Sequence, residues 1–555
     1  MFCTAQAFSN PLFCASLAGV LSWKVLNQHT VPGDYALLGF AAAVLILYLA
    51  VGYAAIPNAL TFTVKVVESY LFSLTTATVA YRLSPWHPLA AYPGPILWRV
   101  SSLALAIVSS SGRRHLVLHE LHKKYGKFVR IGPNKLSINS YTAAPVLYGA
   151  RHHMLKDDSY LVPGHKKAVS LFFKQRKEDH SKRKRIWASA FASTAVQHFF
   201  PPLERRALQL TECIENRTDS NGVVDLVLCI AHFSYDFMGE MIFGGSNKLE
   251  LMNNADPEDI ISSGKLATAL YDCIGQAPWL MEILWYLPGS ELLHRAERYA
   301  AAMMNNRVMA HDVSIRDLSS YLLDANPRTG EKVPLRDLEL EAVQAIPAGS
   351  DNTASTLTIA LFYLLSNPVV YKTLQTELDK VFHDHTIPIE DTKLESIEYL
   401  GAVINEALRL GTPFYVPRIV PPQGTVIDGK NIPGGTVVAL AAYSQQVAEE
   451  NFYPHPLTFD PQRWLDNNEG SKYVTNKSAM TPFSSGPYVC VAKKFAVQEM
   501  RHVLARLVLT FDMTLPEELG SEKWLDGFKN YRTTIFEKPL LAKVTRRTKE
   551  TAVVL

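Results

Sequence analysis

A single cysteine stands in an unusual setting near the carboxyl-terminal end of the chain. In TPFSSGPYVCVAKKFA, residues 481–496, Gly486 and Pro487 interrupt regular structure, Cys490 follows, and a helical pattern begins at Lys493. A thiolate is stabilised near a helix N-terminus, where backbone N–H groups and the positive end of the helix dipole are exposed. Gly486 lets the backbone turn tightly and approach a flat, bulky group. These residues predict a thiolate metal ligand; an inert cysteine buried in a loop is the alternative.

A second set of residues has the spacing of a buried ion-pair network. Glu406 and Arg409 are three residues apart in NEALRL, so that they share one face of a helix. FDPQRWL, residues 459–465, supplies Arg463 in a proline-anchored loop shortly before the cysteine segment. A charge cluster of this kind predicts a structural brace, because half-satisfied buried charges are costly.

A third stretch combines helix-weakening residues with an acid and a hydroxyl. AIPAGSDNTAST, residues 345–356, sets Pro347 and Gly349 inside a long apolar helical pattern, next to Asp351 and Thr353. Proline and glycine weaken the hydrogen-bond ladder of a helix. We therefore expect a break in the helix here, with a small-molecule or proton site beside it.

The elements that must position these residues are mostly helices. Apolar residues recur at helical spacing in residues 353–366, 399–410 and 493–513. Strand signals are short: residues 129–139 alternate around a Pro-Asn turn, and residues 419–442 read as hairpins punctuated by glycine and proline. The pattern predicts a mainly α fold with a small β portion.

Composition limits the classes of function. The chain has 555 residues, enough for a large core, and a formal net charge of +3, too small to indicate nucleic acid as a partner. Its six cysteines form no C-x-x-C pair and no zinc-like spacing. A reducing intracellular compartment is the simpler interpretation.

The first ninety residues differ from the rest. Residues 36–56 are 21 consecutive residues without a charge, about the length that crosses a bilayer. Residues 5–23 and 61–83 are flanking candidates for spans, the second with Lys65 and Glu68 able to pair on one helical face. A secretory signal peptide is the alternative for residues 5–23, and buried core helices are the alternative for the whole region.

The proline-rich segment that follows suggests a division of the chain. We expect a membrane anchor of one to three transmembrane helices over residues 1–84 and a stiff hinge over residues 85–95. Residues 96–555 then form the globular part, without low complexity or internal repeats.

The order of the motifs resembles a known family. E-x-x-R, then F-x-P-x-R-W, then F-x-x-G-x-x-x-C is similar to the cytochrome P-450 haem-thiolate monooxygenases. The similarity covers about residues 92–555 and is greatest to the membrane-bound fungal branch, including YPGP, HLVLHELHKKYGKFVRIGPN and PRIVPPQGTVIDGKNIPGGTVV. It implies the cytochrome P-450 fold preceded by transmembrane helices, with haem b as the cofactor.

The resemblance also implies roles for individual residues. Cys490 is the expected axial ligand of the iron, and a thiolate in that position favours O–O cleavage. The other implied cofactor contacts are Phe483, Gly486, Arg418, His180, Lys184 and Arg185, the last four toward the haem propionates. Glu406, Arg409 and Arg463 are implied to brace the cysteine loop, and Asp351, Asn352 and Thr353 to form the oxygen groove, with Asp351 relaying protons.

Two positions depart from the family pattern. Tyr488 stands two residues before the cysteine, where the family usually has arginine, and so removes one positive charge near a propionate. Asn352 stands where the family usually has threonine. Thr353 is one residue later, about 100° further round the helix, so we expect it to point elsewhere. Either the Asn352 amide orients a water, or the substrate supplies the hydroxyl, or oxygen is not activated in the usual way.

Partners follow from the resemblance and from what the sequence lacks. No FAD, FMN or NADPH-binding module is recognisable, so we expect electrons from NADPH through a separate NADPH-cytochrome reductase, steered by lysines such as Lys493. By resemblance, PWLMEILWYLPG at residues 278–289 lies near an access channel; a core role is the alternative. We expect a lipophilic substrate, for example a terpenoid of secondary metabolism, and an enzyme in contact with membrane lipid at the endoplasmic reticulum, facing the cytosol.

Two other functions remain open at this point. Asn352 is compatible with a haem-thiolate isomerase or dehydratase that needs no reductase. Tyr488 together with the altered oxygen groove is compatible with a non-catalytic haem-binding membrane protein.

Overall fold

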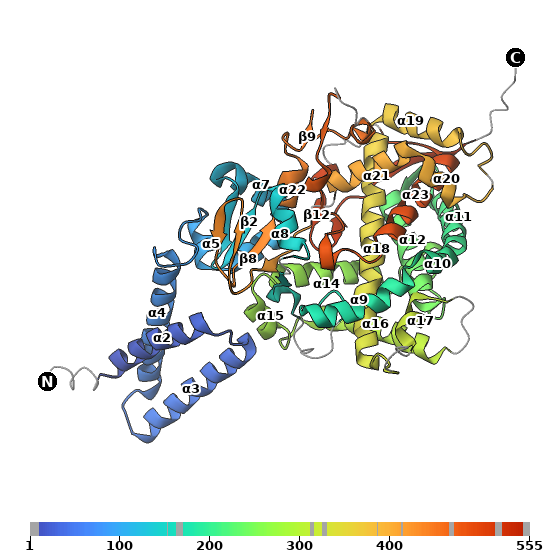
Figure 1. The fold of residues 1–555 in the computed structure, drawn as a ribbon. Helices are drawn as coiled ribbons and strands as arrows, with labels where there is room; N and C mark the ends of the chain where they lie inside the picture. Colours follow the sequence, from blue (N-terminus) through green and yellow to red (C-terminus); the bar gives the residue numbers. More distant parts are fainter. Residues whose placement is uncertain are drawn as a thin grey trace, which may run out of the picture.

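A long buried helix forms the centre of the catalytic part. The computed structural model describes residues 10–151, 154–161, 170–310, 316–324, 330–385, 387–411, 414–465, 471–516 and 524–547. Helix α18 (Leu335–Ser366) runs through the middle of the body (Figure 1). It packs against α12 (Leu226–Phe243), α16 (Glu291–Met309), α21 (Glu398–Gly411) and α23 (Lys493–Thr510).

Helix α12 is apolar because it lies in the core. Its N-cap residue Asp225 accepts a hydrogen bond from the Val227 N–H, and it ends at Gly244 in the left-handed conformation. Gly349 of α18 allows the close contact between the two helices, since a Cβ there would overlap the side chain of Met238. A side chain at position 349 would therefore require Met238 to shift.

The predicted helices are present, with different limits. The pattern at residues 353–366 belongs to the much longer α18, which continues through Pro347 without the break that we expected. Helix α21 matches the prediction within one residue at each end. Helix α23 ends at Thr510, and the predicted last turn is instead strand β11 (Phe511–Thr514), which pairs with β14 (Leu541–Arg546).

The main sheet brings together strands that are distant in sequence. Its order is β1 (Phe128–Gly132), β2 (Lys135–Ile138), β8 (Val437–Leu440), β5 (Arg418–Ile419) and β3 (Leu155–Lys156). The antiparallel β1–β2 pair confirms the hairpin predicted over residues 129–139. Strand β2 pairs with β8 in parallel, with Leu136 opposite Val438. This sheet places Lys156 and Arg418 opposite each other on adjacent strands.

The remaining elements surround this frame. The helices are α5 (Ile96–Val100), α6 (Leu103–Ser110), α7 (Arg114–Tyr125), α8 (Ala144–Tyr148), α9 (Lys177–Ala190), α10 (Ser193–Val196), α11 (Phe200–Arg217), α13 (Leu251–Asn254), α14 (Ile260–Ile274), α15 (Pro278–Leu284), α17 (Leu318–Leu323), α19 (Pro368–Asp379), α20 (Asp391–Ser396) and α22 (Ala442–Gln446). The smaller strands are β4 (Val223–Asp225), β6 (Thr425–Ile427), β7 (Lys430–Ile432), β9 (Phe452–Tyr453), β10 (Val474–Thr475), β12 (Phe528–Asn530) and β13 (Thr534–Phe536). Most of the fold is helical, as predicted.

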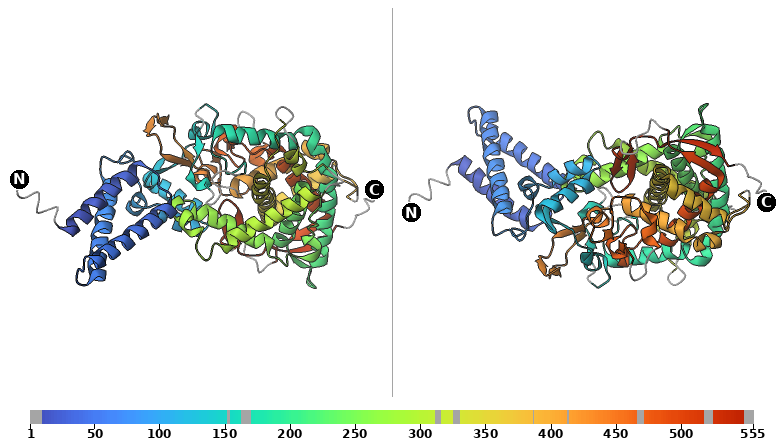
Figure 2. Two further views of the ribbon diagram at one scale, coloured as in Figure 1. Left: turned by 90° about the horizontal axis from the view of Figure 1, so that it is seen from below. Right: turned by 90° about the horizontal axis from the view of Figure 1, so that it is seen from above.

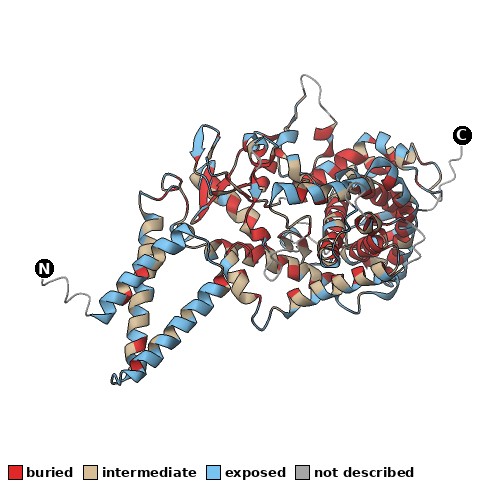
Figure 3. Ribbon diagram, turned by 60° about the horizontal axis from the view of Figure 1, so that its bottom comes forward, coloured by how far each residue is buried: buried red, intermediate tan, exposed pale blue. Residues whose placement is uncertain are grey.

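Three helices at the N-terminal end stand away from this body (Figure 2). They are α2 (Pro11–Gln28), α3 (Gly33–Tyr53) and α4 (Ala59–Leu83). In this region of the described chain, α3 alone is long and apolar enough to cross a membrane on composition, and it is exposed along most of its length (Figure 3). Helices α2 and α4, which cover most of the flanking candidates at residues 5–23 and 61–83, do not reach that criterion.

The three helices are joined to one another and to the body by specific contacts. Helices α2 and α4 approach closely at Gly19, where a Cβ would overlap the Ser73 hydroxyl. The hydroxyls of Ser16 and Ser69 are 2.8 Å apart. Small and hydroxyl residues at such contacts are typical of helix pairs in membranes. At the N-terminus of α3, the Gly33 N–H donates a hydrogen bond to the carboxylate of Glu282 in α15.

The proline-rich segment at residues 85–95 lies against the main sheet. Leu89 and Tyr92 are buried, and the Tyr92 hydroxyl donates to the Asn431 carbonyl oxygen at 2.7 Å. The Arg130 N–H donates to the Pro93 carbonyl oxygen at 2.6 Å. The segment is therefore packed onto the catalytic body.

Candidate active site

A cavity of about 330 Å³ separates the cysteine loop from the central helix. Cys490 and Phe483 lie on one wall. Asn352, Thr353 and Thr356 of α18 lie on another. The cavity thus brings together a thiol, a helix with polar side chains and, at its edge, several cations.

Backbone and lysine contacts fix the cysteine loop. The Cys490 N–H donates to the Phe483 carbonyl oxygen at 2.9 Å. Gly486 has φ +62°, and a Cβ there would overlap the Tyr148 carbonyl oxygen, so glycine is required for this close approach. The Lys184 ammonium donates to the carbonyl oxygens of Pro487 (2.8 Å) and Val489 (2.9 Å). These contacts hold the loop around a thiol that is accessible at the cavity surface.

Opposing effects act on the Cys490 thiol. Burial raises its pKa, whereas a hydrogen bond from the Ala492 backbone and the positive charges of Lys184 and Lys493 act to lower it. Helix α23 begins at Lys493, so Cys490 precedes the helix by a short turn. Ala492, the N-cap residue of this helix, supplies the backbone hydrogen bond to the thiol, as the predicted setting at a helix N-terminus implies.

Cations gather at one end of the cavity. Arg418 is buried, and its Nε has no hydrogen-bond partner among the described residues. Its guanidinium lies 4.7 Å from the ring centre of Tyr488. His180 meets the same ring edge-on, with centroids 4.6 Å apart. Lys184 completes the set of predicted propionate contacts that line this cavity.

The structure places Arg185 differently from the prediction. Arg185 is exposed, its Nε points back toward the Ser181 carbonyl oxygen at 3.4 Å, and it does not line the cavity. Lys184 turns toward the cysteine loop, whereas Arg185 lies on the exposed side of α9. The propionate contact expected of Arg185 is therefore corrected.

The three residues of the expected oxygen groove point to different places. Asn352 and Thr353 both line the cavity with Cys490, so the offset by one residue does not remove Thr353 from it. The Asn352 amide donates to the Ala348 carbonyl oxygen at 3.0 Å, one turn earlier in the helix. Asp351 lies outside this cavity.

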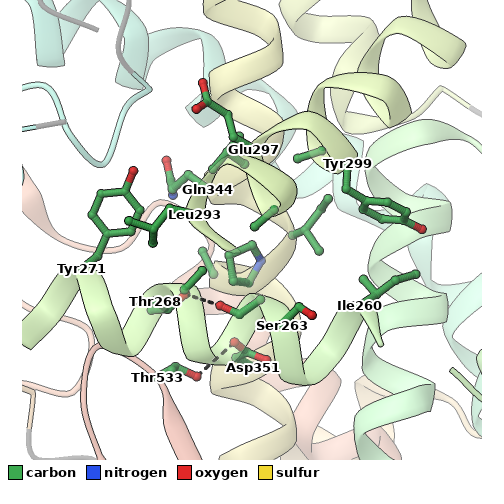
Figure 4. Close-up of a pocket in the computed structure, with 18 of the residues that line it drawn as sticks. Ile260, Ser263, Thr268, Tyr271, Leu293, Glu297, Tyr299, Gln344, Asp351 and Thr533 are labelled. Atoms are coloured by element: carbon green, nitrogen blue, oxygen red, sulfur yellow. Dashed lines mark hydrogen bonds between the residues drawn. The ribbon is translucent and has the colours of Figure 1, made fainter. Parts of the chain in front are cut away.

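Asp351 faces a second cavity of about 210 Å³ between α14, α16 and α18. Its two carboxylate oxygens accept hydrogen bonds from the Tyr235 hydroxyl (3.2 Å) and the Thr533 hydroxyl (3.0 Å). Figure 4 shows Asp351 and Thr533 at one end of this cavity. Burial raises the pKa of Asp351, against the hydrogen bonds and the charge of Lys265. Asn352 lines both cavities and therefore stands at their boundary.

Comparison with known proteins identifies the family. The family model described as Cytochrome P450 matches residues 92–531. The chain belongs to the cytochrome P450 family. It is 29% identical over 491 residues to tryprostatin B 6-hydroxylase of Neosartorya fischeri, covering 87% of both chains. It is 30% identical to the cytochrome P450 monooxygenase AKT7 of Alternaria alternata (82% of this chain, 90% of the relative) and to orf5 of Eupenicillium brefeldianum (87% and 96%).

The residues present fit the haem of this P450 family. A haem offers iron to a thiolate and two carboxylates to cations, and Cys490 and Arg418 with its unpartnered Nε line one cavity. No carboxylate is within ion-pairing distance of Arg418, Lys184 or Lys156 in the described part of the chain. The cation-rich end thus suits an anionic group. The chain is a cytochrome P450 monooxygenase, an oxidoreductase.

The predicted ion-pair network forms, but at some distance from the cysteine loop. Glu406, Arg409 and Arg463 are fully buried. Glu406 accepts hydrogen bonds from Arg409 (2.7 and 2.8 Å), from Arg463 (2.9 Å) and from the Trp464 indole (2.9 Å). Arg409 also donates to the carbonyl oxygen of Gln446 at the end of α22 and to those of Pro456 and Thr458 in the loop before η4 (Pro461–Trp464). The hydrogen bonds of Arg409 join α21 to this loop. Helix α21 in turn packs on α23, which follows the cysteine.

Several residues of the site carry no signal in the sequence. Lys156 and Arg532 line the cavity from strand β3 and from the turn between β12 and β13. Tyr235 and Thr533 hold Asp351 from elements distant in sequence. Glu499 also lines the cavity, and burial raises its pKa to about 8. A single lysine or glutamate has no motif around it, so only tertiary contacts identify these residues.

Proposed function

We propose that the protein is a membrane-anchored haem-thiolate monooxygenase that inserts one oxygen atom from O2 into a lipophilic small molecule of secondary metabolism. Residues 1–84 anchor it and residues 96–555 carry the site. Electrons come from NADPH through a separate reductase. The observation that supports this most strongly is the cavity of Cys490, which Arg418, Lys184 and Lys156 line without an ion-pair partner among the described residues, together with Asn352 and Thr353.

The roles proposed for the chain follow from these positions. Bound haem supplies O2 activation, which a thiolate ligand promotes by favouring O–O cleavage. Cys490 provides the thiolate, and Lys184 keeps its loop in place through the Pro487 and Val489 carbonyl oxygens. Arg418 and His180 bind and orient the cofactor's carboxylate edge. Asp351, which accepts hydrogen bonds from Tyr235 and Thr533, is the proposed proton relay, and Asn352 lines both its cavity and the cysteine cavity.

The proposed substrate class rests on the apolar surroundings and the anchor. Two of the relatives are named as a hydroxylase and a monooxygenase, and both come from fungi. A terpenoid is one class of lipophilic molecule that suits this site. Trp279, Tyr286 and Leu287 are exposed apolar residues in or just after α15, close to the anchor contact at Glu282. We propose that this side faces the endoplasmic reticulum membrane from the cytosol and that substrate enters from lipid.

Replacement of Cys490 tests the central assignment. Cys490→Ser should abolish the characteristic Soret band of the reduced carbon monoxide complex, because a hydroxyl does not replace the thiolate. Cys273→Ser, at a buried free cysteine that does not line this cavity, is the control and should retain the band. A normal band in Cys490→Ser, with circular dichroism showing the same fold in both variants, would refute the proposal.

Product analysis separates oxygen insertion from rearrangement. Microsomes containing the protein and a reductase are fed candidate lipophilic substrates under ¹⁸O2. We expect NADPH consumption and one labelled oxygen atom in the product. Product without reductase and without label would instead favour the isomerase or dehydratase function that Asn352 left open.

A further inference from the structure

A buried lysine that no motif predicts lies at the cation-rich end of the cysteine cavity. Lys156 in β3 is 5% exposed and lines the cavity. Its ammonium donates to the carbonyl oxygens of Leu171 (3.3 Å) and Phe172 (2.6 Å). Among the described residues no carboxylate forms an ion pair with it. A buried ammonium with only carbonyl partners keeps its charge at a considerable cost.

Tyr488 connects this lysine to the neighbouring arginine. The Lys156 ammonium lies 4.9 Å from the ring centre of Tyr488, and the Arg418 guanidinium lies 4.7 Å from it. The Tyr488 hydroxyl donates to the Gln175 carbonyl oxygen at 3.2 Å, which fixes the ring. An aromatic ring stabilises cations over its face without adding positive charge. Tyr488 therefore positions two cations from adjacent strands beside each other.

The local charge is unbalanced in the protein alone. Burial, followed by the charges of Arg418, Arg532 and Lys184, lowers the pKa of Lys156 well below its usual value, and Glu341 alone opposes this. Like charges gathered in a buried place are stabilised when an anion enters between them. The group that supplies two carboxylates in this cavity is the haem, which is part of the proposed function.

We propose that Lys156, positioned by Tyr488, provides the positive charge for a haem propionate that the family pattern draws from an arginine at position 488. The tyrosine and the lysine act as a pair: the ring leaves room for the ammonium, and the ammonium supplies the charge that the ring lacks. The proposal rests on haem binding at Cys490 and adds a binding residue that the motifs do not contain.

Hemin dissociation measures this contact without catalytic turnover. The rate constant is followed as hemin transfers from the full-length holoprotein to excess apomyoglobin. Lys156→Met keeps the length of the side chain and removes the charge, and it should speed hemin loss about tenfold, as loss of one charge-assisted hydrogen bond implies. Arg185→Met removes an exposed cation of α9 that does not line the cavity, and it should change the rate less than about twofold.

Arginine at position 488 tests the pairing. In the Lys156→Met background, Tyr488→Arg should restore the rate to within about twofold of wild type. In the wild-type background it should give no gain, because the charge is already present and a second cation is repelled. A rate in Lys156→Met equal to that of Arg185→Met would overturn the proposal.

The single Tyr488→Arg variant keeps the proposal open to refutation even if Lys156→Met does not fold. If that variant alone slows hemin loss about tenfold, the wild-type site lacks a cation and Lys156 does not supply it. A wild-type protein that binds no hemin would contradict the proposed function itself. Hemin binding in which Lys156 is immaterial would contradict only this inference.

Discussion

Asn352 stands at the boundary between the thiol cavity and the cavity of Asp351, and its amide is already used. The amide nitrogen donates to the Ala348 carbonyl oxygen, so the side chain is bent back along its own helix. Thr353 reaches the thiol cavity as well, whereas Asp351 does not. At this scale the acid and the thiol line separate cavities, and Asn352 is among the residues that line both.

The variant Asn352→Thr tests that separation. We expect unchanged hemin content and an unchanged carbon monoxide spectrum, because Asn352 does not touch the thiol loop. The fraction of electrons that reach product should change by at least about twofold, since a smaller side chain opens the boundary. The measurement is NADPH consumed per product formed. Asn367→Thr, which loses the same kind of bond to the carbonyl one turn earlier, is the control. Equal NADPH consumption per product formed in wild type, Asn352→Thr and Asn367→Thr would show that Asn352 has no part in the mechanism.

At the scale of elements, two buried charge networks fasten the helices around α23. The Glu406 network ties α21 to the loop before η4. A second network joins α11, α20 and α23, where His502 lies 2.5 Å from a Glu204 oxygen and 2.9 Å from an Asp391 oxygen. Arg506 shares Glu204. Both networks hold the frame on which the cysteine loop rests.

Arg409→Ala removes one partner from the first network. It leaves Glu406 buried with an incomplete set of donors, which costs about 3–5 kcal/mol of unfolding free energy. We expect little folded holoprotein, measured as haem per polypeptide after purification. Arg316→Ala breaks an exposed ion pair with Asp324 and should cost at most about 1 kcal/mol. Normal haem content in Arg409→Ala would show that the network does not brace the site.

His502 makes the second network sensitive to pH. Burial lowers the pKa of His502, but the hydrogen bonds and charges of Asp391 and Glu204 outweigh it and raise the pKa. A raised pKa in the folded state means that the stabilisation is fully present below the unfolded value of about 6.5 and disappears as pH rises through the folded value.

The prediction is a difference in melting temperature that depends on pH. His502→Gln should lower Tm clearly at about pH 6, and the difference from wild type should shrink as pH rises above the folded pKa. Differential scanning fluorimetry across this range measures it. His198→Gln, at an exposed histidine, should show no such trend. A Tm difference that does not vary with pH would mean that folding does not raise the pKa of His502.

On the scale of the whole molecule, helix α3 meets α15, which packs against the wall of the second cavity. Glu282 of α15 accepts the Gly33 N–H at the start of α3, and a Cβ at Gly33 would overlap the Trp279 carbonyl oxygen. Helix α15 packs through Met281 on Ala267 of α14, which lines the cavity of Asp351. A negative side chain at a helix N-terminus is favourable, so this contact holds anchor and cavity wall together.

Glu282→Ala should release the start of α3 from α15. We expect backbone amides of α15 to exchange about tenfold faster in hydrogen-exchange mass spectrometry of the protein in lipid nanodiscs, since a charged hydrogen-bond acceptor is lost. Glu291→Ala, at an exposed carboxylate of α16, serves as the control. Unaltered exchange in α15 would show that the anchor and the body are coupled elsewhere.

The sequence by itself determined the chemistry of this protein. The spacing of Glu406 and Arg409, the loop before Cys490 and the apolar helix at Gly33–Tyr53 follow local rules of helix period, turn residues and bilayer length, so they could be recognised from short stretches. The helical class and the β1–β2 hairpin followed in the same way.

Only the tertiary structure decided which side chains share a cavity. Arg185 was expected inside and lies outside, α18 continues through Pro347 where a break was expected, and Lys156 joins the site from a strand without any motif. The direction of a side chain depends on the helix or strand against which it packs, and those partners are hundreds of residues away. Such contacts leave no mark on the local pattern, because burial and pairing are properties of the assembled core.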